Sequence, residues 1–330
     1  MNLYLGRRKW PGIWLCAVVS ASALTATLVA ISAPSSETLA AGPEVATTKA
    51  APPTITPTPP PPTSTPEVYR SFAVALVRED QAWQTDDAGH QFAVIGHSVQ
   101  GRPLVAHRVG AGPRTIVLIG GLHQGAEEAT SKAVQGLFTA IAATPELVPG
   151  GLTIVAITVA NPDGLELGTR LNARSVDLNR NWPTDDWTTP AVHGDTTVSA
   201  GDAPLSEPET SALFSYFQST KPALVASWHG YASIVEGNDI AFAETLAGVF
   251  AEAAGYDLLE KWPYYPITGE LIVALADLGI PAFDVELDRW TTVETDIERN
   301  LEGLIAIFAR ISDTGFGEIP SAAPVPEVAP

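Results

Sequence analysis

Two histidines stand at comparable places in the sequence, because each follows a short apolar run and precedes a turn that contains glycine. His123 comes after the run in "TIVLIGGLH", and His229 comes after the run in "ALVASWHG". Glu127 lies four residues after His123, and Glu286 lies near the end of a third apolar run, "IPAFDVEL". Two imidazoles and two carboxylates are therefore expected near the ends of strands.

This set of side chains matches the ligands of a hydrolytic zinc ion. Zn²⁺ accepts neutral imidazole and carboxylate oxygen, and three protein ligands leave a fourth position for water. A free carboxylate can take the proton of such a water, which then attacks a carbonyl carbon. Two plainer alternatives remain at this point: loop histidines that are merely solvated, and an ion pair between Glu286 and Arg289.

A polar segment, "NPDGLELGTRLNARSVDLNRNWP" at 161–183, is too rich in Asn, Asp and Arg to form a core. It contains three of the chain's 18 basic residues, Arg170, Arg174 and Arg180. Guanidinium groups hold carboxylates through paired hydrogen bonds and stabilise oxyanions. A salt-bridged surface loop is the alternative, and for Arg174 alone it is the favoured interpretation.

The elements that must position these residues alternate between strands and helices. "QFAVIG" and "RPLVAHRVG" flank a turn, which predicts a hairpin. Short apolar runs predict buried strands over 114–120, 152–161, 223–230 and 280–287. Helical spacing marks 127–143, 205–220, 241–255 and 293–311. In the second of these helices Ser206 is the expected N-cap, with Glu209 three residues later.

This alternation predicts an α/β fold with a mostly parallel or mixed central sheet, helices on both faces and a single catalytic domain. Ligands of such sheets bind beyond the carboxyl ends of the strands. The residues at the strand ends are therefore the candidates for function.

Composition narrows the class of protein. The chain has 330 residues, of which 45% are hydrophobic, so a sizeable core is available. A formal net charge of −19 argues against a nucleic-acid partner. Cys16 is the single cysteine, which rules out an intrachain disulfide and a cysteine-rich zinc site. Any metal must therefore be held by His and carboxylate.

The two ends of the chain differ in composition from the rest. Three basic residues precede an almost uncharged N-terminal stretch, which is typical of an export signal or a retained membrane anchor. Secretion or anchoring outside the cytoplasm is expected, with cleavage left open. The expected parts are a signal peptide or anchor over 1–41, a Pro/Thr-rich linker over 42–66, the catalytic domain over 67–313 and a disordered Pro/Ala-rich tail over 314–330.

Several segments, in order, resemble the zinc carboxypeptidase family, and its short bacterial members most closely. They are "NPDG", "TRLNARSVDLNRNWP", "SEPET", "SWHGY" and "FDVEL", all after the His/Glu loop. "VDLNRNWP" is specific in combination with the two histidines, whereas "NPDG" alone is not. The resemblance implies one Zn²⁺ per chain and a peptide substrate with a free C-terminal carboxylate. No nucleic-acid partner is expected, because of the net charge, and a membrane is expected only at the N-terminal segment.

The resemblance also implies roles at the matching positions. The zinc ligands would be His123, Glu127 and His229. The catalytic residues would be Glu286, as general base, and Arg170, which stabilises the oxyanion. The substrate-binding residues would be Asn179, Arg180 and Tyr265, with Tyr264 as the alternative tyrosine. Asp177 would orient a ligand histidine.

One departure concerns the acidic ligand. The family usually spaces its first His and Glu by three residues, whereas "HQGAE" spaces them by four. A glycine in the loop can absorb the extra residue. Glu128 is the less favoured ligand, because it is expected to open the following helix, where its charge suits the N-terminus.

The leading functional hypothesis is an exported zinc metallocarboxypeptidase that removes a C-terminal residue through zinc-activated water and Glu286. A peptidase of cell-wall stem peptides (murein) from the same family is the close alternative. A non-catalytic peptide-binding surface module and a deacylase of amino-acid derivatives are further alternatives. Residues 268–273 are expected to line the side-chain pocket, and whether Glu270 favours a basic terminal residue stays open.

Overall fold

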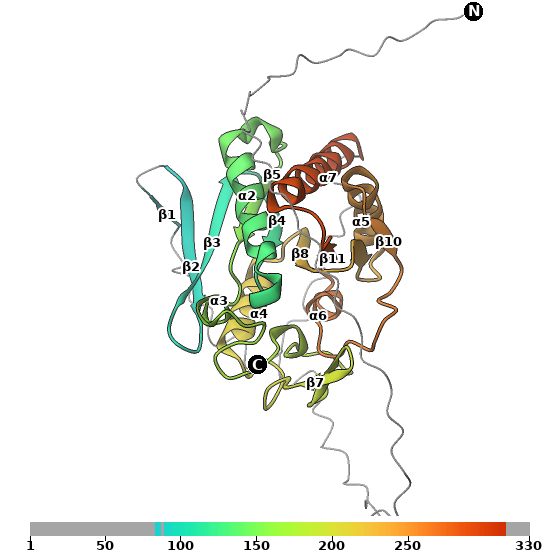
Figure 1. Ribbon diagram of the computed structural model, residues 1–330. Helices are drawn as coiled ribbons and strands as arrows, with labels where there is room; N and C mark the ends of the chain where they lie inside the picture. The colour runs from blue at the N-terminus through green and yellow to red at the C-terminus, as the bar shows by residue number, and fades with distance from the viewer. Residues whose placement is uncertain (1–82, 87–88, 315–330) are drawn as a thin grey trace, which may run out of the picture. The chain divides into compact units, whose positions relative to one another are not determined.

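The computed structural model describes residues 83–86 and 89–314, and these contain a nine-stranded mixed sheet (Figure 1). The strand order is β1-β2-β3-β5-β4-β8-β11-β9-β10. The strands are β1 (Gln84–Thr85), β2 (Gln91–His97), β3 (Pro103–Gly110), β4 (Arg114–Ile119), β5 (Leu152–Ile157), β8 (Leu224–Gly230), β9 (Ile234–Gly237), β10 (Asp257–Leu259) and β11 (Ala282–Leu287).

The centre of the sheet is parallel and its margins are mixed. β5, β4, β8 and β11 pair in parallel, whereas β2 and β3 form the predicted antiparallel hairpin. β9 returns antiparallel to β11. A separate two-stranded sheet consists of β6 (Ala191–His193) and β7 (Thr196–Val198).

Six α-helices and three short 3-10 helices are found in the described ranges. The α-helices are α2 (Ala129–Ala143), α3 (Pro162–Leu167), α4 (Pro208–Thr220), α5 (Ala241–Ala254), α6 (Leu271–Asp277) and α7 (Val293–Thr314). The 3-10 helices are η1 (Gly125–Glu127), η2 (Pro145–Leu147) and η3 (Leu178–Arg180).

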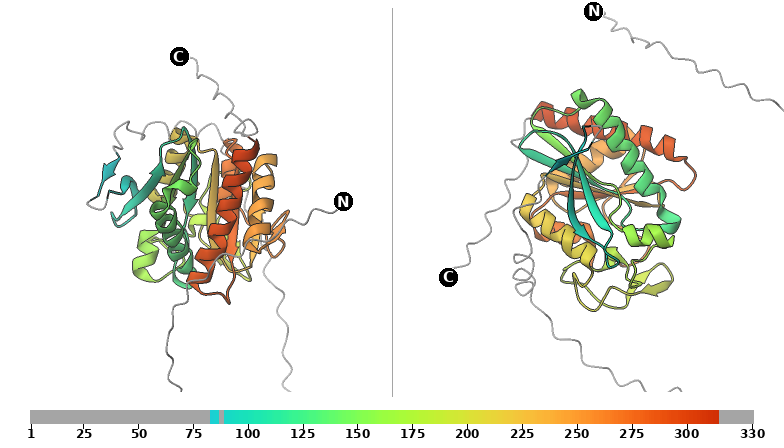
Figure 2. Two further views of the ribbon diagram at one scale, coloured as in Figure 1. Left: turned by 90° about the horizontal axis from the view of Figure 1, so that it is seen from above. Right: turned by 90° about the vertical axis from the view of Figure 1, so that its left-hand side faces the viewer.

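Successive side chains of the central strands enter two different hydrophobic cores. On β4, Ile116 and Leu118 pack in the core with α2, α5 and α7, whereas Val117 and Ile119 pack in the core with α4 and α6. The right-hand view of Figure 2 shows α2 and α7 on one side of the sheet and α4 on the other. Because strand side chains alternate between faces, a continuous apolar run is what a strand covered on both faces requires.

The predicted α/β class, with helices on both faces of a mixed sheet, is confirmed. The predicted N-cap of α4 is wrong, because this helix begins at Pro208 and its N-cap is Glu207. Proline suits the first helical position, where its fixed φ and missing N–H cost nothing. The Ser206 hydroxyl instead donates to Glu207 and accepts from the Asn181 amide.

The expected export segment (1–41) and linker (42–66) lie outside the described residues, as does the tail beyond 314. The proposed domain boundaries therefore remain predictions. Within the described part of the chain, no helix combines the length and the apolar character needed to cross a bilayer.

Candidate metal and active site

The predicted site residues converge because three neighbouring parallel strands end at one edge of the sheet. His123 follows β4, His229 lies near the end of β8, and Glu286 lies near the end of β11. His229 and Glu286 are direct register partners in the β8–β11 pair. His123 and Glu286 are far apart in sequence. They lie at the same edge of the sheet because β4, β8 and β11 are neighbouring strands that run in parallel.

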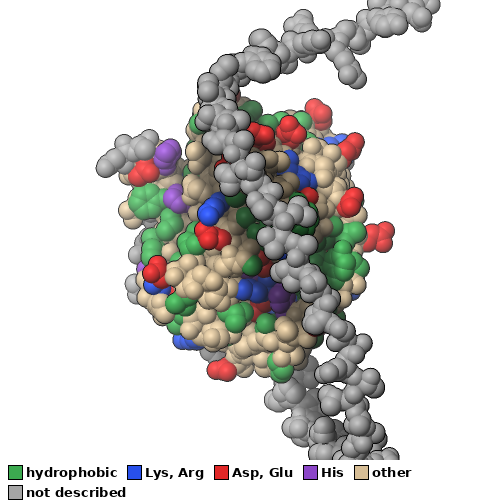
Figure 3. Space-filling model, in the orientation of Figure 1, with side chains coloured by type: hydrophobic (Ala, Val, Ile, Leu, Met, Phe, Trp, Pro, Cys, Tyr) green, Lys and Arg blue, Asp and Glu red, His purple; other side chains and the backbone are tan. Residues whose placement is uncertain are grey.

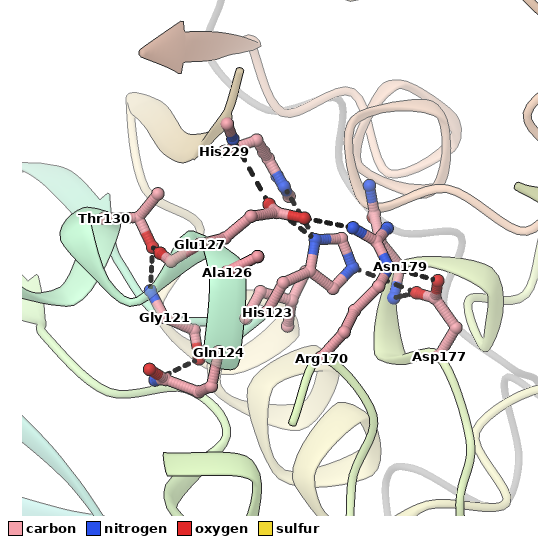
Figure 4. Close-up of polar contacts among 12 residues, drawn as sticks. Gly121, His123, Gln124, Ala126, Glu127, Thr130, Arg170, Asp177, Asn179 and His229 are labelled. Carbon is pink, nitrogen blue, oxygen red and sulfur yellow. Dashed lines mark hydrogen bonds and ion pairs between the residues drawn. The ribbon is translucent and has the colours of Figure 1, made fainter. Parts of the chain in front are cut away.

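The three predicted metal ligands point toward one another (Figure 4). His123 Nδ1 lies 3.2 Å from a carboxylate oxygen of Glu127 and 3.3 Å from His229 Nδ1. Ligands of a tetrahedral zinc ion with bonds of 2.0–2.1 Å lie about 3.3 Å apart. Among the described residues, His123, Glu127 and His229 alone have ligand atoms close enough to share a cation. The donor set and its spacing therefore fit Zn²⁺.

In each histidine the hydrogen bond made by Nε2 leaves Nδ1 to face the metal position. His123 Nε2 lies 3.0 Å from Asp177 Oδ1, and His229 Nε2 lies 2.9 Å from the Ser227 hydroxyl. A proton on Nε2 in each ring leaves the Nδ1 lone pairs for a cation. Both rings are almost fully buried, with 2% and 3% exposure, so the solvated-loop alternative does not hold.

Asp177 links the histidine to an arginine. Its second oxygen accepts a hydrogen bond from Arg170 Nε at 2.9 Å, and its first also accepts from the Asn179 backbone N–H at 3.0 Å. Burial alone would raise the pKa of Asp177, but His123 and Arg170 hold it well below its usual range. Asp177 thus holds the His123 ring in place through a carboxylate that is itself fixed by Arg170 and the Asn179 backbone.

The structure separates Glu127 from Glu128. Glu127 is buried and faces the two histidines, whereas Glu128 is partly exposed and forms an ion pair with Lys132 at 2.8 Å. Gly125 makes this arrangement possible, because its φ is +63° and an added Cβ would lie 2.8 Å from the Gly168 carbonyl oxygen. Burial would raise the pKa of Glu127, but His123 and Arg170 lower it to about 2.

Glu286 lines the same cavity and forms no ion pair with Arg289, whose guanidinium lies over the Tyr231 ring instead. Burial, followed by repulsion from Glu127, raises the pKa of Glu286 to about 8, against the attraction of Arg170. A carboxyl group with such a pKa suits both removal and return of a proton near neutral pH. A bound metal cation would draw this pKa down.

Two arginines present free nitrogens to the cavity. Arg170 uses Nη1 for Glu127 and Nε for Asp177. Buried Arg180 donates from Nε to the Val192 carbonyl oxygen at 3.1 Å and from Nη1 to the Asn179 carbonyl oxygen at 2.8 Å. Within the described part of the chain, Nη2 of each arginine has no hydrogen bond. Each is fixed in position and can bind an anion.

Asn179 and both candidate tyrosines also line the cavity. Asn179 Oδ1 accepts from the Leu271 N–H at 3.0 Å. Tyr264 is 65% exposed, whereas Tyr265 is half-buried and packs edge-on against His193 with ring centres 5.9 Å apart. Burial raises the pKa of Tyr265, while the charges of Arg180 and Arg170 lower it, so this tyrosine lies near the charged site.

The cavity that contains these residues has a volume of about 500 Å³, which is suitable for a small peptide residue. On the face drawn in Figure 3, acidic, basic and histidine side chains are grouped in one place below the centre of the view. Sequence reasoning missed several cavity residues, among them the ionisable residues His193, Glu236 and Asp284. Asp284 had a usable signal, because it stands two positions before Glu286 and so faces the same side of the strand.

Comparison with known proteins agrees with this geometry. The model of the zinc carboxypeptidase family matches residues 84–236, a range that includes the three candidate ligands but not Glu286. Murein peptide amidase A of Escherichia coli (strain K12) is 33% identical over 150 residues, which cover 43% of this chain and 60% of that protein. The Vibrio campbellii (strain ATCC BAA-1116) protein of the same name is 30% identical over 232 residues, which cover 66% of this chain and 87% of that protein.

Solved structures show the same fold. Murein-tripeptide amidase MpaA from Escherichia coli O157 is 25% identical, with a TM-score of 0.53 over 66% of this chain and 91% of that one. Bovine thrombin-activatable fibrinolysis inhibitor is 16% identical and shares the fold, with a TM-score of 0.59 over 75% of this chain and 96% of that one. The chain belongs to the zinc carboxypeptidase family.

Proposed function

We propose that this protein is a zinc-dependent amidase of cell-wall peptides, which cleaves the amide bond before a residue that carries a free carboxylate. The observation that carries the proposal is the convergence of His123, Glu127 and His229 on one point, with Glu286 beside them. Relatives named murein peptide amidase support the substrate class.

The chain's own residues supply most of the chemistry. Arg180, assisted by Asn179, binds the terminal carboxylate and so places the scissile carbonyl. Glu286 takes the proton of the attacking water and returns it to the leaving amine. The free Nη2 of Arg170 donates to the oxygen on which negative charge develops. Bound Zn²⁺ would add Lewis acidity at that oxygen and lower the pKa of the water.

Removal of a C-terminal residue from ordinary peptides is the second candidate. The Asn179–Arg180 pair favours it, because a carboxylate-binding pair suits any substrate that ends next to the cleaved bond.

A cell-wall substrate lies outside the membrane, and the N-terminal apolar stretch and proline-rich linker of the sequence support export. Fractionation of cells that express the full chain, with N-terminal sequencing of the product, tests the location and the cleavage.

The substrate class is tested by incubating the zinc-loaded protein with wall-derived peptides and with ordinary peptides, and identifying the products by mass. A product shortened by one amide cleavage from the wall-derived set alone supports the first candidate. Preferential cleavage of ordinary peptides supports the second. A protein that binds zinc and peptide but turns over neither set is a binding module, and the proposed function is then wrong.

A further inference from the structure

The turn between β11 and α7 places a cation at the rim of the cavity. Arg289 follows Glu286 by three residues and lines the same cavity. The Trp290 N–H donates to Asp288 Oδ1 at 2.9 Å, and the Thr291 hydroxyl donates to the carbonyl oxygen of the same aspartate at 3.0 Å. These hydrogen bonds hold the backbone of the turn without using the Arg289 guanidinium, which is exposed and open to a ligand.

Arg289 differs from the other two arginines of the cavity in its contacts. Arg170 is paired with two carboxylates, and Arg180 donates to two backbone carbonyl oxygens. Arg289 has no hydrogen bond or ion pair with any described residue, and its guanidinium carbon lies 5.7 Å from the centre of the Tyr231 ring. A cation over an aromatic ring is attracted by the ring and keeps its hydrogen-bond donors for a ligand. Because water can solvate an exposed guanidinium, the location of Arg289 decides whether it has a role.

Arg289 and Arg180 are held by different elements around the metal site. The Tyr231 ring beneath Arg289 is tied to η1, because its hydroxyl donates to the Ala126 carbonyl oxygen at 2.8 Å, next to the metal ligand Glu127. Arg180 is bonded instead to carbonyl oxygens of η3 and β6. The two guanidinium groups are therefore anchored to separate parts of the cavity wall.

The metal site connects these two parts of the wall. His123 lies 3.2 Å from Glu127 on η1 and 3.0 Å from Asp177, the N-cap of η3. A substrate whose terminal carboxylate is held at Arg180, with its scissile carbonyl at the metal site, directs its acyl part away from η3. Arg289 then faces the acyl part, across the cleaved bond from Arg180.

We propose that Arg289 binds a free carboxylate on the acyl residue, the residue whose carbonyl is attacked, so that the enzyme prefers substrates with a carboxylate on each side of the cleaved bond. This inference rests on the proposed function, because it assigns the acyl side of that site. A guanidinium holds a carboxylate through two parallel hydrogen bonds, whereas a carboxamide of the same shape has one acceptor oxygen. An acidic side chain can supply this carboxylate, and so can the α-carboxylate of a glutamyl residue whose side chain forms the cleaved amide.

The first test compares substrates whose acyl residue carries either a carboxylate or the isosteric carboxamide. One pair has glutamate or glutamine before the cleaved bond, and the other has a side-chain-linked glutamyl residue with a free or an amidated α-carboxyl group. We expect kcat/KM to be about tenfold higher for the carboxylate in at least one pair, which identifies the source. General attraction cannot produce this result, because a chain of net charge −19 repels an added negative charge. Equal or lower values for the carboxylate in both pairs would overturn the inference.

The second test removes the cation. Arg289→Gln should reduce the carboxylate-to-carboxamide ratio of kcat/KM to about one, with little change for the carboxamide substrate. Arg289→Lys keeps the charge but not the paired donors, so it should keep part of the preference. Arg310→Gln is the matched control, because it removes the same charge from an exposed position on α7 and should leave the ratio unchanged. A ratio that survives Arg289→Gln, or that falls equally in Arg310→Gln, contradicts the assignment.

A binding measurement separates this inference from the proposed function. Glu286→Gln is designed to stop turnover, so the affinity of both substrate pairs can be measured on this zinc-loaded variant, alone and combined with Arg289→Gln. Tighter binding of the carboxylate that disappears in the double variant supports the role of Arg289 even if the wild-type protein cleaves nothing, in which case only the proposed function fails. Cleavage without any preference for the carboxylate in rate or affinity rejects the inference and leaves the function standing.

Discussion

The metal site shares its cavity with three further carboxyl groups, Glu236, Glu270 and Asp284, which we call the acidic pocket, but the charged groups of the two regions are satisfied to very different degrees. Around the metal site, His123 is bonded to Asp177, Asp177 to Arg170, and Arg170 to Glu127. In the acidic pocket, Asp284 Oδ1 and the Glu270 carboxyl group have no such partners. A network in which every group is hydrogen-bonded holds its side chains in one arrangement before any substrate arrives. An unpaired carboxyl group has no such restraint.

The two regions also differ in what would complete them. At the metal site two ring nitrogens approach within 3.3 Å with lone pairs converging, a geometry that a single small cation satisfies. In the acidic pocket the carboxyl groups repel one another without converging on a point. Substitutions in the two regions should therefore have different effects on metal binding, catalysis and stability.

The largest effect is expected from His229→Ala. Loss of one of three ligands should remove most of the bound zinc at ordinary concentrations and reduce turnover to background. Zinc content by elemental analysis and peptide hydrolysis would be measured together, with circular dichroism as the check on folding. A folded variant that keeps one zinc per chain would contradict the ligand assignment.

Glu286→Gln should lower kcat by about 10²–10⁴-fold, because the amide cannot accept the proton of the attacking water. Zinc content should be unchanged, since Glu286 is not among the three converging ligands. This variant thus separates catalysis from metal binding. Wild-type turnover in Glu286→Gln would exclude the proposed general base.

Asp177→Asn tests whether the closed network matters for the metal. The amide cannot act as an anion toward the His123 ring or the Arg170 guanidinium, so zinc affinity should fall by about 10–100-fold. Competition with a chelator measures this affinity. The contribution of Glu270 to the pH dependence of stability should stay as in the wild type, because Asp177 bonds to His123, Arg170 and Asn179. Unchanged zinc affinity in a folded variant would mean that this network does not hold the metal site in place.

The acidic pocket should appear in the pH dependence of stability. The pKa of Glu270 is raised from 4.5 to about 8, so the folded state holds a proton that the unfolded chain releases between these pH values. The free energy of unfolding therefore falls as pH rises through this window. Glu270→Gln removes that contribution and should be more stable than the wild type at pH 8 by up to about 4 kcal/mol, with little difference near pH 4.5. Urea unfolding of the wild type and Glu270→Gln at both pH values measures this difference, with Glu252→Gln as the control. A stability difference of the same size at both pH values would contradict the prediction.

The two regions were not equally predictable from the sequence. His123, His229 and Glu286 stand at the ends of apolar runs, and the rule that parallel strands end at one edge was enough to group them. The short helix α6 and the antiparallel return of β9 have no such pattern. Residues 268–273, which include Glu270, were expected in the cavity from the family resemblance and not from periodicity, and Glu236 was not expected there at all. Their positions depend on packing between distant segments, which no local periodicity records. The start of α4 was also predicted wrongly, because Pro208 occupies the first helical position and makes Glu207, not Ser206, the N-cap.

The acidic ligand was the point that sequence left open, and it supplies the smallest expected effect. Glu128→Gln should leave zinc content and turnover unchanged, because Glu128 is partly exposed and forms an ion pair with Lys132 on the helix surface, away from the two histidines. Glu127→Gln, one position earlier, should lose zinc together with the carboxylate that faces both histidines. The paired measurement decides the register of the "HQGAEE" loop. Loss of zinc in the Glu128 variant alone would mean that the loop around Gly125 turns differently when the metal binds.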